Sequence, residues 1–182
     1  MKSIIVKSDR NYVVEVGIDA KKAINQICQD HNKVLLVGPR SLIKLFRIKE
    51  SKNLSIFETS DGESQKSVTT LERIWKKCAV IGLDRQDAII GFGGGASTDV
   101  AGFAAATWLR GITWYAIPTS LAGMVDAAIG GKTGINSAHG KNLIGAFNSP
   151  QSVIIDHSFL DSLSARDFSA GMAEVIKAGF ID

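Results

Sequence analysis

The chain is poor in cysteine and proline and has no long apolar run. Its 182 residues include three prolines and two cysteines, Cys28 and Cys78. Two cysteines without metal-ligand spacing argue against a disulfide scaffold or a thiolate metal site, and they fit a reducing, cytoplasmic location. No apolar run approaches the roughly 20 residues that span a bilayer, and the N-terminal segment lacks the pattern of a secretory signal. We therefore expect a cytoplasmic globular protein without a membrane partner.

An excess of charge is also missing from the chain as a whole. Lys and Arg total 21 against 18 for Asp and Glu, and a net charge of +3 is too small to indicate a nucleic-acid partner. Residues 86–145 differ from the rest, because they hold 12 of the 18 glycines but only six charged residues, whereas residues 1–85 hold 26. We expect so apolar a segment to be buried, where unpaired charges are costly. The six are Asp87, Asp99, Arg110, Asp126, Lys132 and Lys141; composition alone leaves each open as a site residue, a surface charge or half of an ion pair.

Apolar runs alternate with stretches of helical spacing along most of the chain. The run 33–37 (KVLLV) before Gly38-Pro39 predicts a buried strand, and the apolar spacing in 67–81 predicts a helix. Further strands are expected at 55–57, 87–92, 112–117 and 153–155, and further helices at 98–109 and 167–178. Strands separated by helices predict an α/β fold, with a Rossmann-like, mainly parallel sheet flanked by helices.

A glycine-rich segment lies between an expected strand and an expected helix. The run 91–99 reads GFGGGASTD. At such a junction glycines let a phosphate approach the backbone, and the free N–H groups of the helix start stabilise its charge. The spacing is not the G-x-G-x-x-G of common dinucleotide loops, so a tight turn without a ligand is the alternative.

A second glycine pair precedes a lysine in Gly130-Gly131-Lys132-Thr133. A P-loop would need a glycine where the chain has Asp126, whose charge would repel a triphosphate, so this interpretation is rejected. A lysine on flexible backbone instead suits a phosphate or carboxylate of a small substrate. The alternative is a lysine that binds a loop carbonyl.

Metal-ligand patterns are weak in this sequence. Glu174 and Lys177 lie three residues apart on one expected helix face, where a surface ion pair is the simpler explanation. A single Glu is no metal site, because catalytic zinc takes three protein ligands. The histidines His31, His139 and His157 show no ligand spacing.

Seven ordered segments together resemble the 3-dehydroquinate synthase family of sugar-phosphate cyclases, over nearly the whole chain. They are Asp61-Gly62-Glu63 with Lys66, Gly93–Asp99 with Ala101-Gly102-Phe103, Arg110-Gly111, Pro118-Thr119-Ser120, Met124–Asn136, Gly140–Phe147 and Gly171–Lys177. One small departure is Ala96-Ser97-Thr98, where many members carry branched or glycine residues. The segments AEVIK and GKNLIGAF make iron-type alcohol dehydrogenases more remote relatives.

The resemblance implies an enzyme of the shikimate pathway, which leads to chorismate and the aromatic amino acids. It would be a lyase that converts the sugar phosphate 3-deoxy-D-arabino-heptulosonate 7-phosphate to 3-dehydroquinate and phosphate. In the family, NAD oxidises the substrate transiently, a divalent metal (zinc or cobalt) assists, phosphate is eliminated, and re-reduction and an aldol step close the ring. Members are commonly homodimers.

The resemblance also assigns roles to individual residues. It implies that the cofactor NAD is bound by Asp61, Gly62, Glu63, Lys66, Gly93, Gly94, Gly95, Ala96, Ser97, Thr98, Asp99, Thr119, Ser120, Lys132, Lys141, Phe159, Leu160, Asp161 and Ser162. It implies that the catalytic and substrate residues are Arg110, Asp126, Lys132, Asn142 and Lys177, with Arg110 reaching the substrate phosphate in its own or in a neighbouring subunit. Glu174 would be the first metal ligand.

The family pattern further predicts two domains. Residues 1–158 would form the NAD-binding α/β domain, and 159–182 would begin a helical domain for metal and substrate. In the family that second domain supplies two histidine ligands, so we expect this chain alone to bind metal weakly and to be inactive. It would be a fragment or a truncated gene product. Two alternatives remain: another sugar-phosphate cyclase, and a non-catalytic NAD-binding module.

Overall fold

A seven-stranded, mostly parallel sheet forms the centre of the molecule. The computed structural model describes residues 2–8 and 10–181. In spatial order the sheet contains β1 (Lys2–Val6), β2 (Tyr12–Val16), β9 (Ser152–Ile155), β6 (Thr113–Pro118), β5 (Ala88–Gly93), β3 (Val34–Pro39) and β4 (Leu54–Thr59). All neighbouring strands are parallel except β1 and β2, which are antiparallel. The predicted α/β fold is therefore confirmed.

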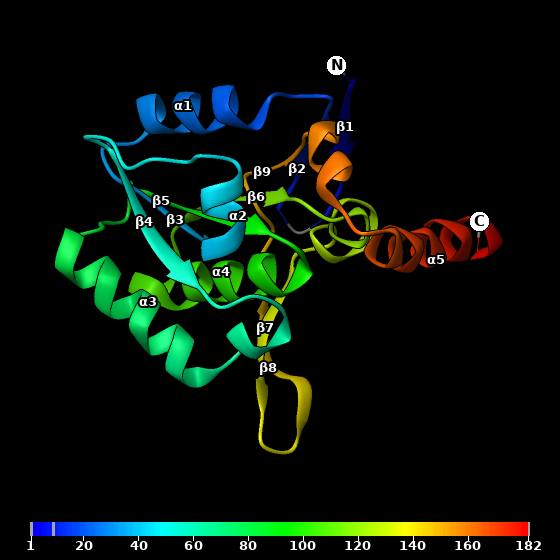
Figure 1. Cartoon of the computed structure of the whole chain (residues 1–182). Coiled ribbons are helices and arrows are strands. Elements are labelled where there is room, and N and C mark those ends of the chain that lie inside the picture. The colour runs from blue at the N-terminus through cyan, green and yellow to red at the C-terminus, as the bar shows by residue number, and fades with distance from the viewer. Residues whose placement is uncertain (1, 9, 182) are drawn as a thin grey trace.

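Helices cover both faces of this sheet. The α-helices are α1 (Ala20–Asp30), α2 (Arg40–Leu45), α3 (Val68–Ile81), α4 (Gly95–Thr107) and α5 (Ala165–Ile181). Short helical turns are η1 (Glu63–Gln65), η2 (Trp108–Arg110), the π-helix η3 (Gly123–Ala127) and η4 (His157–Ser162). Helix α1 lies on one face, and α3 and α4 lie on the other (Figure 1). This follows from right-handed crossovers, because the chain crosses the sheet in one direction through α1 and in the opposite direction through α3 and α4.

The strongest apolar runs fold as predicted. The strands expected at 33–37 and 87–92 appear as β3 and β5, and every residue of both is buried. The helix expected at 98–109 begins three residues earlier, at Gly95, and ends at Thr107. The sequence did not predict β1, β2, α1, α2 or the hairpin of β7 (Lys132–Ser137) and β8 (Gly140–Phe147). Lys132 accordingly begins a strand and does not sit on flexible backbone.

Helix α4 and the β7–β8 hairpin pack unusually closely. A Cβ added at Gly102 would lie 2.5 Å from Thr133 Cγ2 and 2.9 Å from the Trp114 ring. The Asn148 Nδ2 group donates a 3.1 Å hydrogen bond to the Gly102 carbonyl. The small residues of α4 therefore bring the hairpin against the helix, and the hairpin projects from the body of the molecule in Figure 1.

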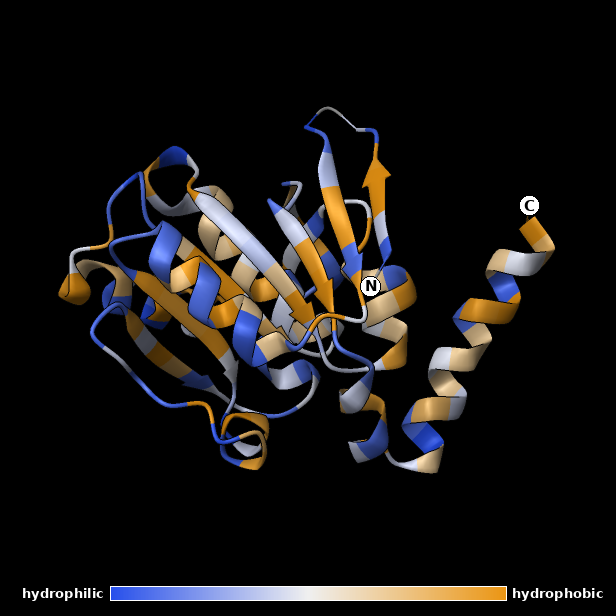
Figure 2. Ribbon diagram, turned by 90° about the horizontal axis from the view of Figure 1, so that it is seen from above, coloured by the Kyte–Doolittle hydropathy of each residue, from blue (hydrophilic) through white to orange (hydrophobic). Residues whose placement is uncertain are grey.

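Helix α5 extends away from the sheet (Figure 2), and within it only Gly171 is buried. A Cβ at Gly171 would lie 2.5 Å from Leu121 Cβ, so this glycine lets α5 rest on the start of η3. Apolar side chains of α5 such as Phe180 and Ile176 are exposed. Across residues 2–8 and 10–181, no helix combines the length and the apolar character needed to cross a membrane.

Candidate functional site

The glycine segment forms a tight turn at the carboxyl end of β5. Gly93 has φ +140°, and a Cβ there would lie 2.8 Å from Ser97 Cβ, so only glycine fits. Gly94 is the N-cap residue of α4 and supplies no side-chain hydrogen bond to the helix start. The positive end of the helix dipole is therefore open at this turn, and this arrangement suits a phosphate group.

Ser97 and Thr98 turn their side chains inward from this turn, and both are 1% exposed. Ser97 Oγ donates to Gln65 Oε1 at 3.1 Å, and Thr98 Oγ1 donates to the Gly95 carbonyl at 3.0 Å. Ala96 between them and the glycines is half-buried. A ligand at this turn would therefore meet backbone amides more than these hydroxyl groups.

An ion pair between a buried lysine and a half-buried aspartate lies beside the start of α4. The side chain of Lys66 is 3% exposed, and its Nζ donates to Asp99 Oδ2 at 2.5 Å. The same Nζ donates to Asn142 Oδ1 of the hairpin, and Glu63 Oε1 lies 3.8 Å away. Burial raises the pKa of the Asp99 carboxyl, and the hydrogen bond from Lys66 opposes that rise only in part. The cluster thus joins three segments distant in sequence through one lysine.

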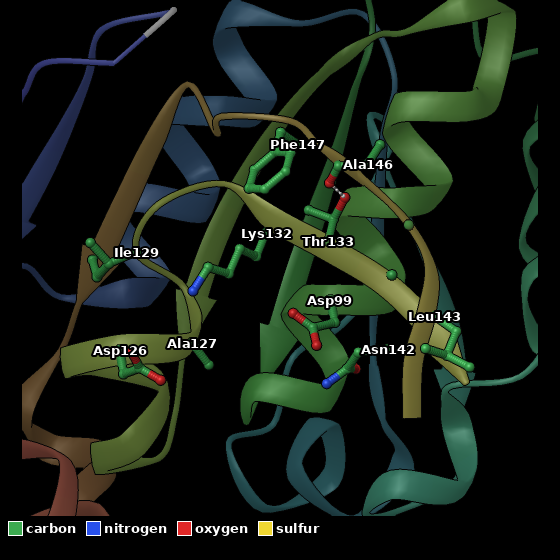
Figure 3. Close-up of a pocket in the computed structure, with 12 residues that line it drawn as sticks. Asp99, Asp126, Ala127, Ile129, Lys132, Thr133, Asn142, Leu143, Ala146 and Phe147 are labelled. Carbon is green, nitrogen blue, oxygen red and sulfur yellow. Dashed lines mark hydrogen bonds between the residues drawn. The ribbon is translucent and has the colours of Figure 1, made fainter. Parts of the chain in front are cut away.

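An open cleft of about 550 Å³ lies next to this cluster. Its lining contains both charged and apolar residues: Asp99, Asp126, Ala127, Ile129, Lys132, Thr133, Gly134, Asn142, Leu143, Gly145, Ala146 and Phe147. In Figure 3 Asp126 and the end of the Lys132 side chain lie on one side, and Asp99 and Asn142 lie beside each other on the other side. The structure therefore brings together four of the predicted site residues from α4, η3, β7 and β8.

Buried hydrogen bonds hold the turn that precedes Lys132. Gly130 and Gly131 have φ values of +91° and +67°. The Gly130 amide donates to the hydroxyl of Tyr12 in β2 at 2.8 Å, and the Asn148 amide donates to the Gly131 carbonyl at 2.7 Å. Tyr12 is 2% exposed. The sequence did not single out Tyr12, because no local pattern connects residue 12 with residue 130.

The expectation that the six charged residues of 86–145 are buried is wrong for four of them. Exposed side chains are found at Arg110, Asp126, Lys132 and Lys141. Asp126 and Lys132 are exposed because they line an open cleft. Asp87 is buried, but its carboxylate accepts hydrogen bonds from the amides of Lys33 and Asp84 at 2.9 and 2.8 Å. Asp87 therefore serves the fold.

The segment after β4 carries Asp61, Gly62 and Glu63 to the carboxyl edge of the sheet, where the glycine turn follows β5. Asp61 accepts a hydrogen bond from the Ser41 hydroxyl. Gly62 has φ +71° and is exposed. After β6, Thr119 is buried and its amide donates to the Gly93 carbonyl at 2.9 Å. Ser120 Oγ accepts from the Gly123 amide at 3.2 Å, and its Cβ lies near the position of a Cβ on Gly94.

The turn η4 contains Phe159, Leu160, Asp161 and Ser162. The Phe159 ring packs against Phe46 and Phe92 with centroid distances of 4.6 and 5.6 Å, and it is 3% exposed. It also lines a smaller cleft of about 200 Å³ beside Phe46 and Ile48. Ser162 Oγ donates to the Phe159 carbonyl at 2.7 Å, whereas Asp161 is exposed. These residues lie apart from the larger cleft.

Glu174 and Lys177 form an ion pair on the surface of α5, with 2.5 Å between Glu174 Oε2 and Lys177 Nζ. The hydrogen bond to Glu174 raises the pKa of Lys177, and the charge of Asp126 adds to this rise. Among residues 2–8 and 10–181, no group of three or more His, Cys, Asp or Glu side chains could hold a metal ion. The residues present therefore do not fit a metal centre by themselves, whereas the open start of α4 fits a phosphate of NAD.

The sequence matches one known protein family. Residues 56–170 match the model of the 3-dehydroquinate synthase N-terminal domain. The chain belongs to the 3-dehydroquinate synthase family. It is 41% identical to the 3-dehydroquinate synthase of Mycobacterium leprae over 185 aligned positions, which cover 98% of this chain and 51% of that protein. It is 50% identical to the enzyme of Prochlorococcus marinus strain MIT 9215, over 93% of this chain and 46% of that one. The chain spans about half the length of these relatives.

Solved structures agree with the family assignment. The 2-epi-5-epi-valiolone synthase of Streptomyces hygroscopicus subsp. jinggangensis, whose structure has NAD+ and Zn2+ bound, is 27% identical with a TM-score of 0.81. The match covers 97% of this chain and 51% of that one. A probable glycerol dehydrogenase from Sinorhizobium meliloti shares the fold at a lower TM-score of 0.69 and 19% identity, over 90% of this chain and 44% of that one. The more remote relation expected for dehydrogenases of this fold is consistent with these values.

Two predicted catalytic residues, Arg110 and Lys177, are absent from the cleft lining, and Arg110 lies at the far end of α4. It follows α4, whose first residue is at the glycine turn, and a helix of this length spans about 20 Å. Leu109 and Arg110 both have left-handed backbone conformations, with φ values of +50° and +67°. Arg110 therefore stands at the amino edge of the sheet, and within one chain it is not part of the site.

Proposed function

We propose that this chain is the NAD-binding half of a 3-dehydroquinate synthase. The reaction would convert 3-deoxy-D-arabino-heptulosonate 7-phosphate to 3-dehydroquinate and phosphate. The observation that carries the proposal is the buried contact of Lys66 with Asp99 and Asn142, placed between the open start of α4 and the cleft. Groups with a perturbed pKa cluster at functional sites, and here burial raises the pKa of the Asp99 carboxyl beside the cleft that it lines.

The dinucleotide would lie along the carboxyl edge of the sheet. The amides of Gly94, Gly95 and Ala96 at the start of α4 would bind its pyrophosphate, since the α4 dipole favours negative charge there and the amides of Ser97 and Thr98 already donate to the Gly94 carbonyl. The segment 61–66 would bind a ribose through the carboxylates of Asp61 and Glu63. Thr119, Ser120 and the η4 residues 159–162 would complete the pocket. When bound, NAD supplies a hydride acceptor and donor for the reaction.

The sugar phosphate would occupy the cleft beside the dinucleotide. Lys132 and Lys141 would neutralise its phosphate or carboxylate, because an ammonium group binds such anions as a point charge. Asn142 would orient the sugar by hydrogen bonding, and Asp126, which also lines the cleft, would hold or accept a proton. Lys177 of α5 would add positive charge, since Asp126 already lies close enough to raise the pKa of that lysine.

Two parts of the proposed enzyme lie outside one copy of this chain. We propose that residues 1–158 are the NAD domain and that 159–182 begin a metal and substrate domain, in which Glu174 would be one ligand of zinc or cobalt. The other ligands would come from additional sequence. Arg110 would act in the site of a second copy, because it stands at the opposite edge of its own sheet, so the active form would be a homodimer.

A second candidate is another sugar-phosphate cyclase. The similarity to 2-epi-5-epi-valiolone synthase at 27% identity favours it as the alternative. The higher identity of 41% to 50% with 3-dehydroquinate synthases favours the first proposal. A non-catalytic NAD-binding module is the remaining alternative, and it keeps the dinucleotide site but lacks the reaction.

The test is phosphate release by a complete protein. The coding DNA is first sequenced beyond residue 182; if the frame ends there, residues 1–181 are joined to the second half of the Mycobacterium leprae relative. With NAD and zinc, this protein should release phosphate from 3-deoxy-D-arabino-heptulosonate 7-phosphate and should not turn over other sugar phosphates. Turnover of another sugar phosphate alone would favour the second candidate. NAD binding without any turnover would favour the module.

A further inference from the structure

The β7–β8 hairpin loses its regular register at Asn136. Ile135 pairs with Ile144 and the next pair is Ser137 with Gly140, so Asn136 alone faces residues 141–143 of β8. In the middle of this bulge Asn142 has φ +58°, a left-handed conformation uncommon outside glycine. Bulges are frequent beside functional sites, where they redirect a side chain. Here the redirected side chain is that of Asn142, which lines the cleft.

Asn136 makes three hydrogen bonds that replace the missing strand pairing. Its Oδ1 accepts from the Asn142 amide at 2.9 Å, and its Nδ2 donates to Glu63 Oε1 at 2.8 Å. Its backbone amide donates to the Lys66 carbonyl at 2.9 Å. One half-buried residue therefore joins the bulge of β8 to the segment that carries Glu63 and Lys66. Both ends of a carboxamide are needed, because one contact requires an acceptor and the other a donor.

We propose that Asn136 is a positioning residue for the dinucleotide and substrate site, an inference that rests on the proposed function. By holding the Asn142 amide, it fixes the left-handed turn that aims Asn142 Oδ1 at Lys66 Nζ. By holding Glu63 and the Lys66 carbonyl, it fixes the other side of the same contact. Asn136 is absent from the cleft lining of the described residues, so it acts through its neighbours. We call the three residues Asn136, Glu63 and Asn142 the Asn136 clamp.

The first test measures hydrogen exchange in the unliganded chain of 182 residues. In Asn136→Ala the Asn142 amide loses its acceptor and should exchange about tenfold faster, as expected for one hydrogen bond. Amides of β3 and β5 should keep their rates. The matched control is Asn148→Ala, which removes an asparagine hydrogen bond at the other end of the hairpin and should leave the Asn142 amide unchanged.

The second test exchanges the chemical roles within the clamp. Asn136→Asp keeps an acceptor for the Asn142 amide. It also replaces the donor to Glu63 by a second carboxylate, which repels that of Glu63. NAD affinity, measured by calorimetry, should fall about fivefold, a size that is common for the interaction energy between residues in contact. Combining Asn136→Asp with Glu63→Gln restores a donor and an acceptor with their roles reversed. The double variant should bind NAD within about twofold of Glu63→Gln alone.

These results separate the clamp from a purely structural role and from the proposed function. Unchanged exchange at Asn142 in Asn136→Ala, or equal acceleration throughout β3 and β5, would overturn the clamp. The clamp would also be overturned if the loss of binding free energy in the double variant equalled the sum of the losses in Asn136→Asp and Glu63→Gln. If the unaltered chain fails to bind NAD, the proposed function fails, and the exchange of the Asn142 amide still decides whether Asn136 holds the bulge.

Discussion

Two aspartates at opposite edges of the sheet differ in what holds them: backbone amides hold Asp87, whereas a lysine side chain holds Asp99 at the proposed ligand site. Asp87 at the amino edge is 1% exposed, and backbone amides of Lys33 and Asp84 satisfy its carboxylate. Asp99 at the carboxyl edge meets the flexible side chain of Lys66, and burial raises the pKa of its carboxyl. Backbone donors fix a charge permanently, whereas a lysine partner can be shared with a ligand. Burial alone therefore does not distinguish a structural charge from a functional one.

The largest expected effect belongs to Asp87. In Asp87→Ala two amides lose their acceptor, and unsatisfied buried groups cost about 1–3 kcal/mol each, so the free energy of unfolding should fall by about 3 kcal/mol. Urea denaturation followed by circular dichroism measures this change. NAD affinity of the folded fraction should remain that of the unaltered chain. A loss of NAD affinity without a loss of stability would reverse the roles assigned to the two aspartates.

Asp99→Asn should show the opposite pattern. Removing the carboxylate relieves the cost of burying its charge, and the amide that replaces it keeps an oxygen acceptor for Lys66. Asn142 Oδ1 and Glu63 also remain near Lys66 Nζ, so the unfolding free energy should change by less than about 1 kcal/mol. NAD affinity should fall about tenfold, as expected for one charge-assisted contact. Calorimetry and urea denaturation on the same preparation give both values. A stability loss as large as that of Asp87→Ala would make Asp99 a structural residue.

Tyr12 links the fold to the cleft and should have a moderate effect. Tyr12→Phe removes only the hydroxyl that accepts from the Gly130 amide, and the unfolding free energy should fall by about 1 kcal/mol. Amide hydrogen exchange should accelerate at residues 130–132, and it should change less, or not at all, in the glycine turn of residues 93–99. If exchange at residues 130–132 is unchanged, the hydroxyl does not hold the turn that presents Lys132.

The pH dependence of stability should show the smallest effect. The pKa of Asp99 is raised above its ordinary value of 3.8. Between the ordinary and the raised pKa, the folded chain binds more protons at this group than the unfolded chain does. Its contribution to stability therefore falls as the pH rises through that window. The difference in unfolding free energy between the unaltered chain and Asp99→Asn, measured from pH 3 upward, should follow this sign, and the reverse slope would contradict it.

The sequence predicts the centre of this fold better than its projecting parts. The apolar runs of β3 and β5 and the glycine turn before α4 are local patterns, so their structure follows from nearby residues. The β7–β8 hairpin was missed because its glycines and mixed polarity show no strand alternation, and its packing depends on Gly102 of α4. Asn136 and Tyr12 gave no local signal, since both act on residues distant in sequence. The amino-edge position of Arg110 could have been predicted, because it follows a helix that begins at the carboxyl edge.

The most direct test of this account is a titration of the 182-residue chain with NAD, followed by amide resonances. A dinucleotide site at the carboxyl edge predicts saturable binding with a Kd of about 1 mM, a binding free energy of roughly 4 kcal/mol, since the 182 residues span about half of the relatives' length. The shifted amides should lie in 61–66 and 93–99, and those beside Asp87 should not move. Absence of any shift at several millimolar NAD, or shifts confined to the amino edge, would contradict the central claim.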